Sequence, residues 1–162
     1  MVVFCTDLDN TIIYSYKHDI GDRKRNVELY QGREISFITD KTYDLLREIK
    51  NNIIIIPTST RTKEQYDRID LGIGAFEYAL VCNGGLLIKQ GKSDADWYEE
   101  SLKLIEESIE DIEKSLLVLE KDERRKFELR FIEKLFVFTK CNNPGDVVNE
   151  LKQQLDLSLI HI

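Results

Sequence analysis

The chain has 162 residues, of which 42% are hydrophobic and 33% are charged, with only two prolines and eight glycines. This composition is typical of a globular protein and excludes a low-complexity or disordered chain. The length predicts one domain, or one domain with an inserted piece. The net charge of −7 and the isoelectric point near 5.0 oppose nucleic-acid binding, because the protein's field repels phosphate backbones. A small anionic substrate would therefore need a local countercharge, such as a metal ion.

The cysteines and the hydrophobicity pattern indicate a cytoplasmic protein. Cys5, Cys82 and Cys141 are odd in number and lack the paired spacing of a zinc site or a disulfide framework. Asp7 follows the N-terminus too closely for the apolar core of a signal peptide. No stretch approaches the roughly 20 apolar residues of a membrane span. We therefore expect no membrane partner.

The first part of the chain alternates predicted strands and helices. We expect a strand at 2–6 that is buried on both faces, a polar surface flap at 14–33, a short strand at 35–38, a helix from Thr39 or Asp40 to about Lys50, a central strand at 53–56, a short helix at 63–69, and a strand at 78–82 that turns at Gly84-Gly85 into an apolar run at 86–88. Strand, helix and strand in this order predict a parallel pair. Residues 1–90 are thus predicted to form a Rossmann-like α/β core.

The composition then changes to an acidic, helical and finally mixed pattern. The expected elements are a helix at 96–123 with one apolar face, a strand at 135–138, a turn at 142–145, a short helix at 146–155 and a strand at 157–162. Residues 91–162 are therefore predicted to be an α+β cap inserted in the core fold. The predicted cap breaks off on a strand and is incomplete.

Two carboxylates follow the first predicted strand. Asp7 and Asp9 flank Leu8, and Asn10 and Thr11 come next. In an open parallel sheet, ligands bind at the carboxyl ends of the strands. Oxygen ligands suit a hard cation such as Mg²⁺, and a carboxylate nucleophile beside a divalent ion suits phosphoryl transfer. Taken alone, the same pattern is also that of a strand-end turn capped by aspartate.

The ordered set of segments resembles the haloacid dehalogenase superfamily. The sequence FCTDLDNTII at 4–13 resembles the first motif of that superfamily, in which D-x-D is followed by a small or polar residue and Thr or Val. IIIIPTSTRTKEQYDRI at 53–69 resembles the second motif, an apolar strand ending on Thr or Ser. YALVCNGG at 78–85 resembles the Asn-Gly segment of the subgroup with a large α/β cap, which includes sugar-phosphate and sucrose-phosphate phosphatases. The resemblance covers residues 1–90 well and the cap only in outline.

The resemblance implies roles for the residues after the first strand. Asp7 would attack phosphorus, while Asp9 would act first as general acid and then as general base for the water that cleaves the aspartyl phosphate. Mg²⁺ would bind an oxygen of Asp7 and the backbone carbonyl of Asp9. The loop with Asn10 and Thr11 would hold the phosphate through its amides.

Three further residues are candidates for binding the substrate. Ser59 best matches the phosphate-binding hydroxyl of the second motif, although Thr58 and Thr60 leave its register open. The alternative is that Ser59 caps the next helix, and the two roles are compatible. Arg61 either contacts the anionic substrate or is a surface charge. Asn83 either orients the substrate or makes the turn.

Two later elements of the superfamily cannot be placed in this sequence. These are a lysine that holds the phosphate and an acidic motif that completes the magnesium site. Gly145-Asp146 has the form of that acidic motif, but we interpret it as a helix start inside the cap. A sheet without its last strands would expose an edge, for which a second copy of the chain is a candidate cover.

The sequence thus predicts a magnesium-dependent phosphomonoester hydrolase that acts on a small phosphate, with a sugar phosphate as one candidate. The alternative is a truncated or degenerate module that binds magnesium, phosphate or a partner without turnover. A phosphomutase of the same superfamily stays open. A phosphoacceptor receiver domain is disfavoured, because its acceptor belongs on a middle strand whereas Asp7 follows the first.

Overall fold

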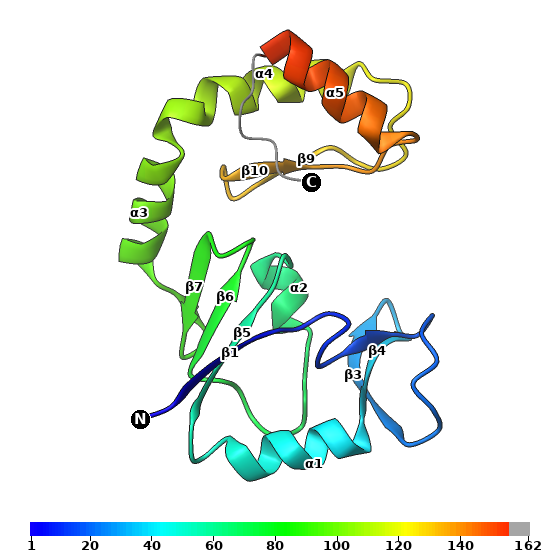
Figure 1. Cartoon of the computed structure of the whole chain (residues 1–162), viewed down its shortest axis with the longest axis vertical. Coiled ribbons are helices and arrows are strands. Elements are labelled where there is room, and N and C mark those ends of the chain that lie inside the picture. The colour runs from blue at the N-terminus through cyan, green and yellow to red at the C-terminus, as the bar shows by residue number, and fades with distance from the viewer. Residues whose placement is uncertain (156–162) are drawn as a thin grey trace. The chain divides into compact units, whose positions relative to one another are not determined.

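The computed structural model describes residues 1–155 and shows two compact units, Met1–Tyr98 and Glu99–Ile162 (Figure 1). The boundary falls inside helix α3, Ala95–Leu104. The assignment of a core to 1–90 and a cap to 91–162 stays a prediction. The strand expected at 157–162 lies outside the described residues.

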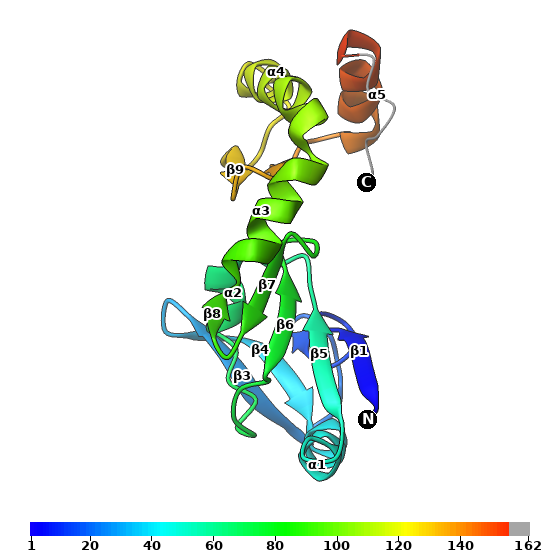
Figure 2. The same cartoon turned by 90° about the vertical axis from the view of Figure 1, so that its left-hand side faces the viewer.

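A five-stranded sheet forms the centre of the first unit (Figure 2). Its strands are β1 Val3–Asp7, β5 Ile54–Thr58, β6 Tyr78–Val81, β7 Leu86–Lys89 and β8 Lys92–Ser93, in that spatial order. The pairs β1–β5 and β5–β6 are parallel, whereas β7 returns antiparallel to β6. The parallel α/β core and the hairpin at Gly84-Gly85 are therefore as predicted.

Strand β1 is not buried on both faces, and that expectation was wrong. Val3 and Phe4 are 50% and 44% exposed, and only Thr6 of the strand is buried. The reason is the position of β1 at the edge of the sheet, where β5 is its only partner strand among the described residues. An apolar run predicts a strand, but it does not distinguish a central strand from an edge strand.

The segment after the first motif is a folded sheet rather than a loose polar flap. It contains β2 Tyr14–Ser15, β3 Lys24–Tyr30 and β4 Arg33–Thr39, which pair antiparallel in the order β2-β4-β3. We expected a strand only near 35–38. Two apolar side chains inside this sheet, Val27 at 4% exposure and Ile38 at 0%, explain the difference. Their burial anchors the sheet to the first unit.

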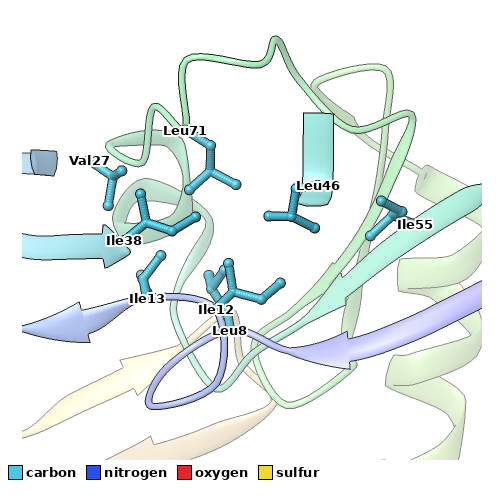
Figure 3. Close-up of a cluster of buried hydrophobic side chains, with 8 residues drawn as sticks. All are labelled: Leu8, Ile12, Ile13, Val27, Ile38, Leu46, Ile55 and Leu71. Atoms are coloured by element: carbon cyan, nitrogen blue, oxygen red, sulfur yellow. The ribbon is translucent and has the colours of Figure 1, made fainter. Parts of the chain in front are cut away.

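The core of the first unit joins this small sheet to the large one (Figure 3). Eight buried side chains meet there: Leu8, Ile12, Ile13, Val27, Ile38, Leu46, Ile55 and Leu71. Leu46 comes from α1, Asp40–Ile49, which Thr39 caps by accepting a hydrogen bond from the Thr42 amide at 3.1 Å. The predicted helix and its cap are confirmed. The core therefore lies directly beneath the loop that carries Asp9.

The second unit begins with more than one helix. We expected one helix at 96–123, but a 3₁₀ turn at Glu106–Ser108 separates α3 from α4, Ile109–Glu120. The acidic side chains in this 3₁₀ turn and in the first turn of α4 favour a new helix start, because the positive end of a helix attracts negative charge.

The rest of the second unit pairs two strands and adds a last helix. Strands β9 Arg130–Ile132 and β10 Phe136–Phe138 are antiparallel, and β9 was not expected. Helix α5, Pro144–Leu155, packs Val147 and Leu151 against Leu119 of α4. Asp146 lies in the first turn of α5, so the interpretation of Gly145-Asp146 as a helix start is confirmed.

No helix in residues 1–155 is both long enough and apolar enough to cross a membrane.

Candidate functional site

The carboxyl ends of β1 and β5 bring the two sequence motifs together. Asp7, the last residue of β1, is paired in register with Thr58, the last residue of β5, and Ser59 follows at the same edge. Ser59 is 4% exposed, and its amide donates to the carbonyl of Leu80 on β6 at 2.9 Å. The parallel topology therefore places the first and second motifs at one edge of the sheet.

Buried apolar side chains and backbone hydrogen bonds hold the loop after Asp7 in place. Leu8, Ile12 and Ile13 are at most 4% exposed, so they fix the loop from below. The Ile12 and Ile13 amides both donate to the Leu8 carbonyl, at 3.0 and 2.9 Å, and the Asn10 amide donates to the Ile13 carbonyl at 2.8 Å. The Asn10 amide, which was expected to help hold a phosphate, thus already donates within the loop.

Asp7 is an exposed carboxylate at the end of its strand. The hydroxyl of Thr11 donates to its Oδ2 atom at 3.2 Å. This places Thr11 beside the predicted nucleophile. A carboxylate that is open to solvent can approach a phosphorus atom or donate an oxygen to a cation.

Asp9 lies in a different environment, because Arg61 grips it with two hydrogen bonds. Arg61 Nε donates to Asp9 Oδ2 and Nη2 donates to Oδ1, both at 2.8 Å. Burial lowers the pKa of Arg61, but hydrogen bonds and charge from Asp9 and then Glu28 outweigh it, so the pKa is raised overall. Arg61 is therefore not an isolated surface charge, and two of its N–H groups engage both oxygens of Asp9.

Ser59 contacts both members of the Asp9–Arg61 pair. Its Oγ accepts a hydrogen bond from the Arg61 amide at 3.1 Å and lies 3.4 Å from Asp9 Oδ2, which it contacts as a weak donor. Ser59 does not cap α2, Lys63–Asp67. Thr62 does so through a capping box with Gln65. The alternative interpretation of Ser59 as a helix cap is therefore wrong, and its side chain contacts the Asp9 carboxylate.

Asn83 lies in the turn between β6 and β7, where its φ of 58° is left-handed. Its amide donates to the Ser59 carbonyl at 3.2 Å, so the turn supports the second motif from the next strand. The residue is exposed. The structure thus gives Asn83 a place in the turn, and its contact with a substrate stays a prediction.

Glu28 is a member of the site that the sequence did not indicate. It comes from β3, its side chain is 0% exposed, and its Oε2 accepts from Arg61 Nη1 at 2.8 Å. No motif includes this residue, which is 33 positions before Arg61 in the sequence.

One pocket of the described residues is lined by none of the candidate site residues. It is a cavity of about 740 Å³ in the second unit, lined mainly by apolar side chains of α4, β10 and α5. Three of its lining residues, Leu119, Val147 and Leu151, also form the core of that unit. Because the cavity and the core share these residues, we interpret the cavity as an open part of that core.

The residues present supply part of a magnesium site. Within residues 1–155, no group of three or more His, Cys, Asp or Glu side chains is placed to hold a metal ion. Asp7 nevertheless offers the hard oxygen ligand that Mg²⁺ prefers, and Mg²⁺ commonly binds through one or two carboxylates, waters and substrate phosphate. The Asp9 carboxylate is already held by Arg61, so only its backbone carbonyl fits a ligand role.

The fold and this edge define a mixed α/β, Rossmann-like protein with paired carboxylates at the carboxyl end of its first strand. The sequence matches no protein-family model and no curated protein. The sucrose-phosphatase of Synechocystis sp. PCC6803, solved in complex with sucrose and phosphate, is similar in structure, with a TM-score of 0.55 and 10% identity. The similarity covers 96% of this chain and 55% of that one, so the chain spans about half the length of the sucrose-phosphatase.

This likeness confirms the mixed α/β, Rossmann-like fold predicted from the sequence. At 10% identity the comparison concerns the fold and does not assign a subgroup. The roles of Asp7, Asp9, Ser59 and Arg61 stay predictions.

Proposed function

We propose that this chain hydrolyses a small phosphomonoester, with Asp7 as nucleophile and Mg²⁺ as cofactor. The observation that supports the proposal most is the meeting of Asp7, Asp9 and Ser59 at one edge of parallel strands. One carboxylate there is open to solvent and the other is held by an arginine. Two carboxylates in different environments can divide the work of nucleophile and acid–base group.

In the proposed reaction, an oxygen of Asp7 attacks phosphorus and the bond from phosphorus to the ester oxygen breaks. Asp9 gives a proton to the departing oxygen, which leaves as an alcohol. Asp9 then takes a proton from water, whose oxygen attacks the aspartyl phosphate and releases inorganic phosphate while Asp7 is restored. When bound, Mg²⁺ supplies positive charge that offsets the anionic phosphate.

Arg61 and Ser59 have specific parts in this proposal. Arg61 occupies both oxygens of Asp9, whereas the acid step needs an Asp9 oxygen that is free to carry a proton to the leaving group. An incoming phosphate is a dianion that competes for the same guanidinium. We infer that substrate binding opens the Arg61–Asp9 fork, while the Ser59 hydroxyl donates to a phosphate oxygen.

The test is magnesium-dependent release of phosphate from an aryl phosphate and from a panel of sugar phosphates. The full chain is compared with Asp7→Asn and with Asp44→Asn, a control that makes the same change on α1. The proposal expects release that needs Mg²⁺, is lost in Asp7→Asn and persists in Asp44→Asn. Equal release by both variants would contradict it.

A second candidate function is a module that binds phosphate or magnesium without turnover. The contact of Arg61 with Asp9 favours it, because both oxygens of that carboxylate are already engaged by the guanidinium. Phosphate binding measured by calorimetry, together with no release from any substrate in a folded sample, would support this second function over the first.

A further inference from the structure

Glu28 is a buried carboxylate in the middle of a charged network. Its oxygens accept hydrogen bonds from Ser36 Oγ at 2.6 Å, from Arg61 Nη1 at 2.8 Å and from Arg68 Nε at 3.3 Å. Burying a carboxylate is strongly unfavourable unless it is paired and hydrogen-bonded. The two guanidinium groups and the hydroxyl meet that requirement.

The backbone of β3 is shaped to deliver this side chain. The pairing of β3 with β4 shifts register on both sides of Glu28, which is the mark of a β-bulge. Asn26 Nδ2 donates to the carbonyls of Glu28 and Ser36, both at 3.0 Å, and so closes the irregular stretch. Bulges redirect side chains and are common near active sites. Here the bulge faces Glu28 toward Arg61.

We propose that Glu28 is a positioning residue of the phosphoryl-transfer site and that it acts on Asp9 through Arg61. This inference rests on the proposed function. The guanidinium of Arg61 is a rigid plane, so holding its Nη1 corner on Glu28 fixes the direction of the Nε and Nη2 edge that grips Asp9. Arg61 is 15% exposed on its side chain, which leaves it little room to turn.

The same geometry determines what happens when substrate arrives. If Asp9 leaves the fork, Glu28 still holds Arg61 in place, with its freed edge directed toward the ends of β1 and β5. A phosphate oxygen can then replace the Asp9 carboxylate on a guanidinium that is already oriented. Preorganised charge of this kind lowers the cost of the chemical step. Glu28 would thus affect turnover without touching the substrate.

A purely structural role for Glu28 is the competing explanation. Glu28 also pairs with Arg68 and forms an isolated bridge with Ile69, so it helps to attach β3 to the segment after α2. A structural anchor would change stability and not the chemical step. The two explanations therefore differ in whether a change at Glu28 lowers kcat and in whether that loss depends on Arg61.

The experiment compares Glu28→Gln with Glu64→Gln in the full chain. Gln has one carbonyl oxygen and one NH₂ group, so its NH₂ group must face one of the two arginines and one of the hydrogen bonds to Arg61 or Arg68 is lost. Glu64 pairs with the same Arg68, but it is 86% exposed, so its variant removes equal charge without touching Arg61. Ser36→Ala is a milder second variant, because it removes one hydrogen bond to Glu28.

For phosphate release, we expect Glu28→Gln to lower kcat and kcat/KM equally, by about 10- to 100-fold, with Ser36→Ala in the same direction and Glu64→Gln unchanged. In an Arg61→Met background the Glu28→Gln change should have less than about a twofold further effect, because the path through Arg61 is gone. An undiminished effect in that background, or equal kcat for Glu28→Gln and the wild type, would overturn the proposal.

A second readout does not depend on turnover. The Nε proton of Arg61, observed by NMR, should exchange slowly in the wild type and in Glu64→Gln, and at least about tenfold faster in Glu28→Gln. If the wild type releases no phosphate, the proposed function fails, yet this exchange rate still tests whether Glu28 holds Arg61. Equal exchange in Glu28→Gln and the wild type would refute the positioning role.

Discussion

Replacing Leu8 by Ala should loosen the loop that carries the candidate site. Leu8 stands between Asp7 and Asp9, it is 1% exposed, and it lies in the core beside Ile12 (Figure 3). Removing a fully buried leucine costs its transfer free energy and leaves a cavity, together about 3 kcal/mol within a range of 2–5. Since small domains unfold with about 5–15 kcal/mol, Leu8→Ala should fold but be clearly weakened.

The matched control is Leu45→Ala on α1. Leu45 is 51% exposed, so the same truncation removes about half of the burial and should cost about 1 kcal/mol or less. The two variants should therefore differ by about 2 kcal/mol although the chemical change is identical. In catalysis, Leu8→Ala should also lower phosphate release, whereas Leu45→Ala should not.

The assay is urea unfolding followed by tryptophan fluorescence. Trp97 is the single tryptophan of the chain and lies in the first unit, where its indole Nε1 donates to the Gly84 carbonyl at 2.9 Å. Its signal therefore reports on the unit that contains Leu8. We expect a lower midpoint with an unchanged m value. Equal midpoints for Leu8→Ala and Leu45→Ala would refute the view that the core supports the loop.

Two other predictions concern α2. Thr62→Ala removes the capping box and should lower the free energy of unfolding, measured in urea, by about 1 kcal/mol. The control Thr60→Ala changes an exposed threonine and should be close to neutral. Equal losses of stability in the two variants would contradict the role of Thr62 as the cap. Burial raises the pKa of Tyr66 from 10.0 to about 12, so the folded state favours the neutral phenol. Its contribution to stability is present below pH 10 and is lost as the pH rises through about 12. A tyrosinate absorbance titration should show a late phenol that Tyr66→Phe removes, and an unchanged titration would contradict this.

Much of the site could be predicted because it depends on local sequence and strand direction. An apolar strand followed by Asp7 and a second strand followed by Ser59 are enough to place both residues at one sheet edge if the strands are parallel. The Thr39 cap is equally local, since it depends on residues three apart.

The charged network could not be predicted in the same way. Glu28 reaches Arg61 across 33 positions and Arg68 across 40, through a bulge whose register no local pattern specifies. The sequence left Arg61 as either a substrate contact or a surface charge. Only the packing of β3 against the segment around α2 shows that it joins two carboxylates.

The exposure of β1 escaped prediction for a related reason. The apolar residues from Val3 to Cys5 would suit a central strand, and edge position is a property of the whole sheet. Whether a second copy of the chain covers this edge stays a proposal.

The central claim is that Asp7 receives the phosphoryl group. The most direct test is to quench the full chain in acid after mixing it with an aryl phosphate and Mg²⁺, reduce the product with borohydride, and locate the modified residue by mass spectrometry. An acyl phosphate on Asp7 would be reduced to homoserine at position 7, and the account predicts this mark in the wild type and its absence without substrate. Phosphate release with no modification at position 7, or modification at Asp9 instead, would contradict it.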